Sequence, residues 1–419
     1  MVAPYRAAKG VHDVLPPDVF LWQQIERTAS AVFNSYGFDE LRPPIIEHTE
    51  VFTRSIGEAT DIVDKEMYTF TDKGNRSLSL RPEATASVVR AFVQNGMHTL
   101  PSPLKLYYMG PMFRYERPQK GRQRQFYQIG VEAFGIKEPK LDAEVIAMLM
   151  ELLKGMGLTG LTCEINSLGC DKCRPAYREA LIEYFEPKLG SLCFDCNSRH
   201  TKNPLRILDC KQPGCMEERK GAPHATGFLC DECRGHFESL QILLNDLRVS
   251  FKLNPEMVRG LDYYTSTAFE VTSTELGAQN AVAAGGRYDN LVQEFGGPDT
   301  PAIGFALGME RLVALLKDKA IVASAPALDA FVATVGHEAA RQGLVIAERL
   351  RSKGFRVEVA YGTASLKNQM KRADRLGARY VLILGQDEIK EGLLSYKRMD
   401  DGSSGKISAG EAEDLLASK

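Results

Sequence analysis

The sequence predicts an α+β fold in which an antiparallel sheet flanked by helices carries a cysteine-rich insertion and is followed by a C-terminal α/β domain with a mostly parallel sheet. Residues 104–115 and 125–134 are two apolar, aromatic-bearing runs joined by a segment rich in Gly, Pro, Lys and Arg, which is typical of a β-hairpin with a basic turn. All nine cysteines lie between Cys163 and Cys233 of the 419 residues, which indicates a local module. Beyond Asp329, strand-like and helix-like segments alternate, as they do in α/β domains.

The composition is that of a globular protein and limits the partners of the chain. Hydrophobic residues make up 44% and charged residues 25% of the sequence. No apolar run approaches the roughly 20 residues that a membrane span needs. We therefore expect a soluble protein with no membrane contact. Cytoplasmic residence is expected because the N-terminus shows no targeting pattern. With a formal net charge of −2, a nucleic-acid partner must be held by local basic patches.

The N-terminal region predicts one helix and one strand. Apolar residues at helical spacing predict a helix over residues 19–36 that ends before Gly37. Residues 39–47 are predicted to form a strand, although they include Pro43 and Pro44. Because proline cannot donate to a strand ladder, we expect this strand at a sheet edge or a subunit contact.

The next segment predicts a hairpin and a helix. Residues 67–80 are expected to form two strands around a turn at 71–75. A helix should begin near Ala84, directly after Glu83. A carboxylate at a helix start is stabilised by the helix dipole, so Glu83 either only caps the helix or also binds a ligand.

The basic hairpin carries the first candidate site. Arg114 is expected on its first strand, with Glu116 two residues further on and facing the same side. This pairing puts a phosphate-binding guanidinium fork beside a hydrogen-bond acceptor for a base. Both groups should lie at the mouth of one groove.

The cysteine-rich segment begins after a predicted helix at 141–156 and a predicted strand at 161–166. The spacing of Cys170, Cys173, Cys193 and Cys196 fits a structural zinc site. Four further cysteines could make a second site; they are Cys210, Cys215, Cys230 and Cys233. The alternative is that all of them are reduced thiols packed in a core.

Strand-like patterns return after the insertion, at residues 257–273 and 277–297, and residues 301–317 predict a strand that leads into a helix. A Pro/Ala/Ser segment at 323–327 is predicted to be a linker. The elements expected beyond it are strands at 329–335, 356–361 and 379–384 and helices at 337–353 and 365–376.

Common nucleotide-binding and hydrolase motifs are missing from the sequence, including the P-loop, the strand-associated G-x-G-x-x-G and G-x-S-x-G. What remains is a set of arginines at expected strand ends and a helix start: Arg114, Arg259 and Arg311. Each alone could be a structural ion-pair member. Together on one antiparallel sheet they predict a polyphosphate held by guanidinium forks.

Several segments together resemble one family. Residues 19–47, 110–135 and 304–312 are similar to motifs 1, 2 and 3 of the class II aminoacyl-tRNA synthetases. Residues 259–265, RGLDYYT, are similar to the signature of the histidyl-tRNA synthetase family, and residues 81–85 and 285–289 add to the resemblance. The resemblance covers nearly the whole chain.

The resemblance implies a domain organisation and an activity. A catalytic domain would span residues 1–325, interrupted by the cysteine-rich insertion at 170–245, and an anticodon-binding domain would span 326–419. The implied enzyme is a homodimeric ligase that activates L-histidine with ATP and Mg²⁺ to histidyl-adenylate. It then transfers the histidyl group to the 3′ end of tRNA(His).

The resemblance also implies roles for individual residues. Arg114 and Arg259 would hold the α-phosphate and act in catalysis, Arg311 would hold the γ-phosphate, and Glu116 would meet the adenine amino group. The histidine site would comprise Glu83, Thr85 and Gln128 for the α-ammonium group and Glu132 and Tyr264 for the imidazole, with Tyr263 and Arg122 as secondary candidates. Tyr263 and Tyr264 could instead simply pack in the core.

For tRNA, the resemblance implies contacts from the hairpin loop through Lys120, Arg122 and Arg124. On one face of the predicted helix at 365–376, Lys367, Lys371 and Arg375 would add anticodon-side contacts, although such a stripe can also be a solvated face.

The main alternative is a non-catalytic paralogue, the histidine-sensing regulatory subunit of ATP phosphoribosyltransferase. Such proteins typically lack the C-terminal domain and lose active-site residues, whereas this chain keeps its three arginines and continues well beyond Asp329. A generic nucleotide-binding module would leave the basic loop and the C-terminal domain unexplained.

Overall fold

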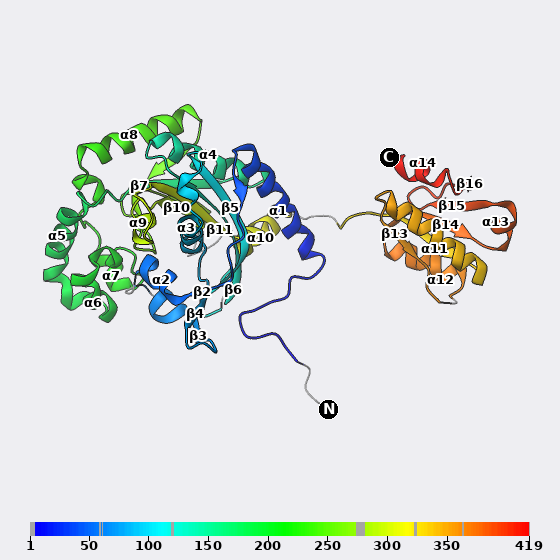
Figure 1. Cartoon of the computed structure of the whole chain (residues 1–419), viewed down its shortest axis with the longest axis horizontal. Coiled ribbons are helices and arrows are strands. Elements are labelled where there is room, and N and C mark those ends of the chain that lie inside the picture. Colours follow the sequence, from blue (N-terminus) through cyan, green and yellow to red (C-terminus); the bar gives the residue numbers. More distant parts are fainter. Residues whose placement is uncertain are drawn as a thin grey trace. The chain divides into compact units, whose positions relative to one another are not determined.

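The chain divides into two units, Met1–Ala323 and Ser324–Lys419 (Figure 1). The computed structural model describes residues 5–57, 60, 62–118, 121–273, 281–321, 325–362 and 364–418. Two residues of the predicted linker, 323 and 324, lie outside the described residues, and residues 325–327 belong to no helix or strand.

An eight-stranded sheet forms the centre of the first unit, in the order β1-β5-β6-β11-β10-β9-β7-β8. The six inner strands pair antiparallel, and the outermost strands, β1 and β8, pair parallel with their neighbours. The strands are β1 (Asp39–Glu40), β5 (Leu104–Phe113), β6 (Gln125–Phe134), β7 (Leu161–Ser167), β8 (Phe251–Leu253), β9 (Thr265–Ser273), β10 (Ala281–Arg287) and β11 (Ala302–Gly308). The predicted antiparallel sheet is therefore confirmed.

The predicted hairpin is β5 and β6, paired from Leu104↔Phe134 to Phe113↔Gln125. Its first strand ends at Phe113. Arg114 and Glu116 therefore follow the strand, whereas the sequence had predicted Arg114 to lie on it. The backbone N–H of Arg114 still donates to the carbonyl of Arg124, at 2.9 Å, which keeps the two sides of the hairpin together there.

The two faces of the sheet have different coverings because side chains alternate along each strand. On β6, Ile129, Val131 and Ala133 join the main hydrophobic core. That core is completed by residues of four helices, α1 (Asp18–Ser35), α4 (Pro139–Gly155), α8 (Asp231–Asp246) and α10 (Met309–Asp318). The intervening Gln128 and Glu132 face the opposite side, where a pocket lies.

The pocket face is partly covered by α3 (Thr85–Gln94), whose Phe92 stacks on Phe134 with ring centroids 4.4 Å apart. Two short helices pack near α3: α2 (Thr49–Ile56) and α9 (Leu291–Glu294). A second, three-stranded sheet has the order β2-β4-β3, with β2 (Ile46–His48), β3 (Tyr68–Thr71) and β4 (Ser77–Leu80), which confirms the predicted hairpin at 67–80.

The predicted proline-containing strand is two strands. Residues 39–47 split into β1 of the large sheet and β2 of the small one, with the prolines between them. A side chain ties this stretch to β5: Arg81 Nη1 donates to Pro43 O at 2.7 Å, and Arg81 Nε donates to Pro111 O of β5 at 2.9 Å. The expected edge position is confirmed for both strands.

The insertion leaves the sheet at the end of β7 and returns at β8, and its green helices lie beside β7 in Figure 1. Its last helix packs on α4. The elements are α5 (Arg174–Phe185), η3 (Glu186–Ser191), α6 (Phe194–Lys202), η4 (Pro204–Ile207), α7 (Pro213–Glu218), η5 (Ala225–Phe228) and α8 (Asp231–Asp246). A small core of its own, which includes Leu181, Phe185, Cys196 and Ile207, holds the elements before α8 together, whereas α8 packs its apolar residues into the main core.

The second unit has a five-stranded sheet in the order β13-β12-β14-β15-β16. The predicted parallel strands are β12 (Leu328–Thr334), β13 (Val357–Val359) and β14 (Ala378–Leu384), and the predicted helices are α11 (His337–Ser352) and α12 (Leu366–Arg375). The sequence prediction missed the antiparallel strands β15 (Leu393–Arg398) and β16 (Ser404–Ser408) and the short helices α13 (Gln386–Glu391) and α14 (Ala412–Ala417).

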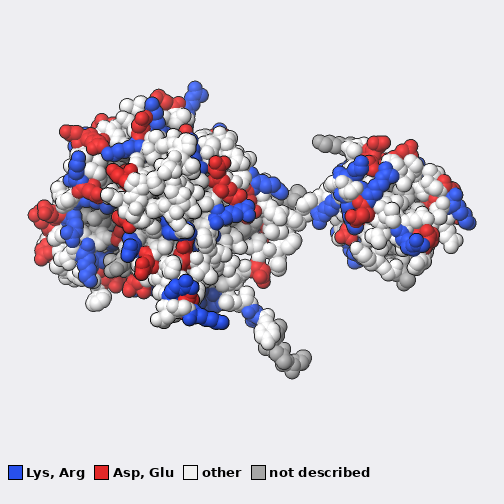
Figure 2. Space-filling model, in the orientation of Figure 1, with Lys and Arg blue, Asp and Glu red and all other residues white. Residues whose placement is uncertain are grey.

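Charged side chains of both signs are interspersed over the visible face of the larger unit (Figure 2), in keeping with the small formal net charge of −2. Within the described part of the chain, no helix combines the length and the apolar character that crossing a membrane requires.

Candidate functional site

A cavity of about 310 Å³ opens on the pocket face of the large sheet. Its walls come from the β5–β6 hairpin, the start of α3, strands β9, β10 and β11, and the loop at residues 259–264 that precedes β9. The residues predicted from the sequence that line it are Glu83, Thr85, Arg114, Glu116, Arg122, Gln128, Glu132, Arg259, Tyr263, Tyr264 and Arg311. Segments far apart in the sequence thus meet at one site.

The floor of the cavity is made of small residues. Along β11, Ile303, Phe305 and Leu307 belong to the helix-covered core, which leaves Gly304 and its alternating neighbours on the pocket face. A Cβ at Gly304 would lie 1.8 Å from Glu132 Oε2. The space exists because these positions carry almost no side chain.

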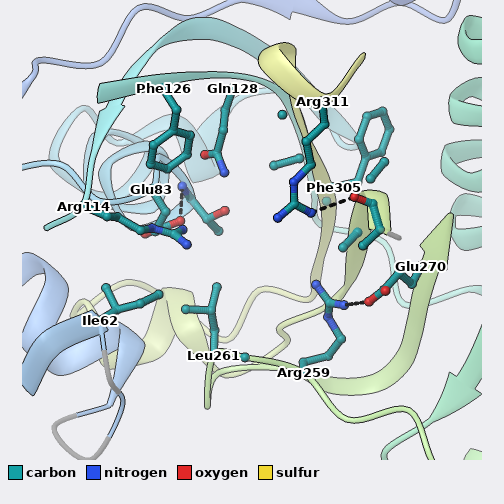
Figure 3. A pocket seen from close by; sticks show the side chains of 18 of the residues that line it. Ile62, Glu83, Arg114, Phe126, Gln128, Arg259, Leu261, Glu270, Phe305 and Arg311 are labelled. Carbon is teal, nitrogen blue, oxygen red and sulfur yellow. Dashed lines mark hydrogen bonds and ion pairs between the residues drawn. The ribbon is translucent and has the colours of Figure 1, made fainter. Parts of the chain in front are cut away.

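The three predicted arginines point toward the middle of the pocket (Figure 3). Each is oriented by the protein. Arg259 forms an ion pair with Glu270 at 2.8 Å, and Arg311 Nη1 donates to Ala281 O at 2.7 Å. Arg114 Nε donates to Pro82 O at 2.9 Å, and its guanidinium group lies 5.2 Å from the Phe126 ring centroid.

The sequence analysis predicted that all three arginines lie on strands of the antiparallel sheet. This prediction is wrong, since none of them lies on a strand. Arg114 follows β5, Arg259 lies in the loop before β9, and Arg311 lies in the first turn of α10. All three side chains nevertheless line the same cavity. The Nε of Arg259 is buried and makes no hydrogen bond within the described chain.

Carboxylates and hydroxyls gather at the inner end of the cavity. Glu83 accepts the backbone N–H groups of Thr85 at 2.7 Å and Ala86 at 2.9 Å, so the capping interpretation is confirmed. Glu132 accepts hydrogen bonds from Thr85 Oγ1 at 2.7 Å and from the Tyr288 hydroxyl at 2.5 Å. Burial raises the pKa of Glu132 to about 8, since the charged form is desolvated. Burial likewise raises the pKa of Glu83 above its usual range.

Two buried polar atoms at this end make no hydrogen bond within the described chain: Gln128 Oε1 and the Tyr108 hydroxyl. Such atoms are costly unless a partner is supplied, so they indicate a polar ligand. The aromatic rings of Tyr263, Tyr264 and Tyr288 stand close by, with centroids 4.8 Å apart for the first pair and 5.7 Å for Tyr263 and Tyr288.

Sequence reasoning gave no role to Glu270, Tyr288 and Glu310, although all three line the cavity. Glu310 accepts the Tyr127 N–H at 3.0 Å, and burial raises its pKa to about 7. Tyr288 could have been found, because it lies within the Gly-Gly-Arg-Tyr-Asp segment that was already singled out. Glu270 gives no sequence signal beyond its place on a strand, since its importance comes from the ion pair with Arg259.

The predicted tRNA contacts are only partly described. Lys120 lies outside the described residues. Arg122 Nη1 lies 3.0 Å from a Glu116 carboxylate oxygen, and Arg124 stacks on Tyr115 with its guanidinium group 3.7 Å from the ring centroid. In the second unit, Lys367, Lys371 and Arg375 are exposed on α12.

The cysteines form two tetrads, and not the grouping that spacing suggested. Cys170 and Cys173 join Cys230 and Cys233, whereas Cys193 and Cys196 join Cys210 and Cys215. In each tetrad all the sulfur atoms lie within 4.8 Å of one another, and all nine cysteines are free thiols. The expectation of one site built from the first four cysteines is wrong because the chain folds back and brings a later pair to each earlier one.

Comparison with protein families gives two matches. The histidyl-tRNA synthetase family matches residues 10–170 and 213–312, and the anticodon binding domain family matches residues 329–419. Residues 171–212, which include most of the insertion helices, fall between the two matched stretches of the first family.

Similar proteins cover the whole chain. A histidine–tRNA ligase of Thermodesulfovibrio yellowstonii is 50% identical over 99% of both chains, and one of Trichlorobacter lovleyi is 53% identical over 94% of both. Among solved structures, apo histidyl-tRNA synthetase of S. aureus is 38% identical with a TM-score of 0.84 and covers 99% of this chain. A Bacillus halodurans structure described as an ATP phosphoribosyltransferase regulatory subunit/histidyl-tRNA synthetase shares the fold, at 22% identity and a TM-score of 0.66.

Proposed function

Because the chain belongs to the histidyl-tRNA synthetase family, we propose that its cavity binds histidine at the inner, carboxylate-lined end and ATP along the three arginines. The activity of the chain is that of a histidine–tRNA ligase, and its anticodon-binding domain is present. The roles of individual residues are the proposal.

The ATP end of the cavity offers positive charge, which complements the negative charge of the phosphates. Arg114 and Arg259 bind the α-phosphate, where negative charge grows during the reaction, and Arg311 binds the γ-phosphate. Because Glu270 and backbone carbonyls already hold these side chains, little reorganisation is needed when the nucleotide arrives. Glu116 accepts a hydrogen bond from the adenine amino group, and Mg²⁺, when bound with ATP, would help to neutralise the phosphate charge.

The histidine end offers acceptors and donors for every polar group of the amino acid. Glu83, Thr85 and Gln128 receive the α-ammonium group, and Glu132 with Tyr263 and Tyr264 receives the two imidazole nitrogens. The observation that carries this assignment is the unpartnered Gln128 Oε1 and Tyr108 hydroxyl in a cavity wall. A site with such groups discriminates strongly, because a ligand lacking the matching atoms leaves them buried and unpaired.

The proposed reaction has two steps. A carboxylate oxygen of histidine attacks the α-phosphorus of ATP, the new O–P bond forms, and the bond to pyrophosphate breaks as pyrophosphate leaves. A hydroxyl of the terminal adenosine of tRNA(His) then attacks the histidyl carbonyl carbon, and AMP leaves. Positioning and charge neutralisation by Arg114 and Arg259 carry the first step.

Contacts with tRNA(His) are proposed from two regions. The hairpin loop with Lys120, Arg122 and Arg124 reaches the acceptor end, and the basic face of α12 reaches the anticodon side. We also propose cytoplasmic residence, which agrees with nine free cysteines.

A homodimer is proposed on the exposed residues beside the proline-containing stretch. Ile45 and Ile46 are 41% and 48% exposed, next to edge strands of both sheets of the first unit. Sedimentation velocity should show twice the chain mass, and Ile46→Asp should shift the species toward the monomer. A monomeric wild-type protein at micromolar concentration would contradict the dimer.

Structural zinc is proposed for the cysteine-rich insertion. Zinc prefers four thiolates in a closed site, and each tetrad offers four thiols that are buried or half-buried.

The test of the proposed site is histidine-dependent ATP–pyrophosphate exchange. The wild-type protein should exchange with histidine and with no other amino acid, and Arg259→Ala should lose at least 10²-fold in kcat, as is typical when a group that stabilises transition-state charge is removed. Arg341→Ala is the matched control, because Arg341 is 71% exposed in the second unit. Full activity of Arg259→Ala would overturn the assignment.

A further inference from the structure

The loop at residues 259–264 has two sides. Arg259, Gly260, Leu261, Tyr263 and Tyr264 line the cavity, whereas Asp262 does not. Asp262 Oδ1 instead accepts hydrogen bonds from two side chains of the insertion, Arg206 Nη2 at 2.9 Å and Asn203 Nδ2 at 3.1 Å. Arg206 Nη2 also donates to Gly260 O at 2.7 Å. The insertion therefore holds the back of the loop whose front forms the proposed histidine site.

A second insertion residue holds the end of the loop. The Arg174 guanidinium group donates to the carbonyl of Tyr264. One residue before Arg174 is Cys173, and the Gly169 carbonyl accepts the N–H of Ser266 at 2.9 Å. The entrance of the insertion is thus attached directly to the start of β9.

Each of these holding residues is next to a cysteine tetrad. Arg174 follows Cys173 of the tetrad Cys170, Cys173, Cys230 and Cys233, which we call the root tetrad because it joins the start of the insertion to the start of its last helix, α8. Asn203 and Arg206 lie between Cys196 and Cys210 of the other tetrad, which we call the distal tetrad.

The tetrads have the dimensions of a tetrahedral zinc–thiolate site. Four sulfur atoms at about 2.3 Å from one ion are about 3.8 Å from each other. The Sγ–Sγ distances are 3.7 Å for Cys170 and Cys173, 3.9 Å for Cys170 and Cys230, and 3.9 Å for Cys193 and Cys210. Disulfide-bonded sulfurs would be about 2.05 Å apart, so the geometry does not fit an oxidised pair.

The backbone around the tetrads also suits thiolates. The N–H of Cys230 points to Cys173 Sγ and the N–H of Cys193 points to Cys215 Sγ, both at 3.2 Å. Cys173, Cys193 and Cys230 directly precede the helices α5, α6 and α8, where the free N–H groups of a helix start favour negative charge.

We propose that the chain binds two zinc ions, one in each tetrad, and that the insertion they hold together positions the loop at 259–264 for histidine. The proposal rests on the histidine-binding role of Tyr264 proposed above. Arg174, Asn203 and Arg206 are positioning residues, which act on histidine only through the loop. Without zinc, the insertion keeps only a small apolar core, and the donors that hold Asp262 and Tyr264 lose their fixed places.

The zinc content of the protein tests whether each tetrad binds an ion. The full-length protein, purified under reducing conditions without added metal, should contain about two zinc ions per chain by elemental analysis. Cys233→Ser should lose one ion from the root tetrad, and Cys215→Ser should lose one from the distal tetrad, because three ligands hold zinc less tightly than four. A wild-type protein that contains no zinc and takes up none from added Zn²⁺ would refute the two sites.

Steady-state kinetics test the positioning role with variants that leave every cysteine unchanged. Arg206→Ala should keep both zinc ions and raise the KM for histidine roughly tenfold, since a charge-assisted hydrogen bond that orders the loop is lost. The KM for ATP should change less, because only Arg259 of the three proposed ATP-binding arginines belongs to the loop, and its ion pair with Glu270 does not involve the insertion. Arg206→Lys should recover part of the loss. Lys220→Ala, at an exposed insertion residue, is the control that should leave both constants unchanged.

The outcomes separate this proposal from the proposed function. A wild-type protein with two zinc ions and no histidine-dependent exchange would show that the histidine site is wrong and would remove the basis for the positioning role. A histidine KM that stays at the wild-type value in Arg206→Ala and in folded Cys233→Ser that has lost the root-tetrad zinc would overturn the positioning role alone. Circular dichroism spectra that match the wild type establish folding for each variant.

Discussion

At the scale of single residues, Glu132 has the most restricted chemistry. Its carboxyl group is 1% exposed, and both oxygens already accept hydrogen bonds from Thr85 and Tyr288. Burial moves its pKa from an ordinary 4.5 to about 8. At neutral pH the group is therefore mostly protonated in the unliganded protein, and it can donate as well as accept a hydrogen bond to an imidazole.

This pKa predicts a pH dependence of stability. Between pH 4.5 and 8 the folded state holds a proton on Glu132 that the unfolded state has lost, so stability decreases as pH rises through this range. The contribution is at most about 1.4 kcal/mol per pH unit. Urea unfolding at pH 5.5, 6.5 and 7.5 should show a shallower decrease for Glu132→Gln than for wild type. Buried Glu83 and Glu310 act in the same direction and should leave a residual slope.

The second residue-scale prediction concerns Gly304. Gly304→Ala would put a methyl group 1.8 Å from Glu132 Oε2, so that side chain must move. We expect a loss of about 1–3 kcal/mol in stability, typical of overpacking, and a raised KM for histidine. Gly190→Ala is the control, because a Cβ there meets nothing within 4 Å. Chemical denaturation and pyrophosphate exchange measure the two effects, and wild-type values for both would show that the pocket floor yields easily.

The sequence analysis identified most of the charged residues that line the cavity, but it gave no role to the glycine that makes room for one of them. Arg114 and Arg259 stood out as arginines at expected strand ends, whereas Glu132 received a role only through the family resemblance. The importance of Gly304 arises only when β6 and β11 pair, because its missing side chain makes room for Glu132. A contact between strands that are far apart in sequence gives no local signal.

At the scale of elements, one side chain joins α12 to the sheet of the second unit. Gln369 is 4% exposed. Its amide accepts from Thr334 N at 2.9 Å and donates to Thr334 O and Ala364 O, both at 2.8 Å. It thereby satisfies the backbone at the end of β12, where no further strand pairing is available to those atoms.

Gln369→Ala should destabilise the second unit by about 1–3 kcal/mol, because buried backbone groups lose their partners. Asn368→Ala, which changes a neighbouring amide on the exposed side of α12, should have little effect. Differential scanning calorimetry should show the loss, while histidine-dependent pyrophosphate exchange in the first unit stays at the wild-type rate. Equal melting temperatures of the two variants would show that the hydrogen bonds of Gln369 do not contribute to the stability of the second unit.

Local patterns predicted most elements well and failed where long-range pairing decides. The β5–β6 hairpin, the parallel strands of the second unit and α1 follow from periodicity. Residues 39–47 were expected as one strand, but the prolines divide them between two sheets. The cysteines were paired by spacing along the chain, whereas the fold pairs Cys170 and Cys173 with residues that lie beyond four further cysteines.

At the scale of the whole molecule, the two units separate the chemistry from part of the tRNA recognition. All residues of the cavity belong to Met1–Ala323, and the anticodon-binding family matches only residues 329–419. Activation of histidine and selection of tRNA should therefore be separable.

A chain ending at residue 323 should retain histidine-dependent pyrophosphate exchange within a few-fold of wild type. Its rate of histidyl transfer to tRNA(His) should fall by at least 10²-fold at limiting tRNA, because contacts from a large part of the nucleic-acid interface are removed. Filter-bound radiolabelled histidine measures the transfer. Undiminished transfer would mean that the first unit alone recognises the tRNA.

The root tetrad has a consequence for how this protein can vary. Its four cysteines lie just after β7 and at the start of α8, the helix that leads back to the sheet, so these two parts of the insertion are fixed to each other independently of what lies between. The family match passes over residues 171–212 and resumes before the second pair of root cysteines. The segment between the two pairs of root cysteines can therefore vary in length while its attachment stays in place, but a replacement that removes Asn203 and Arg206 also removes their hydrogen bonds to Asp262.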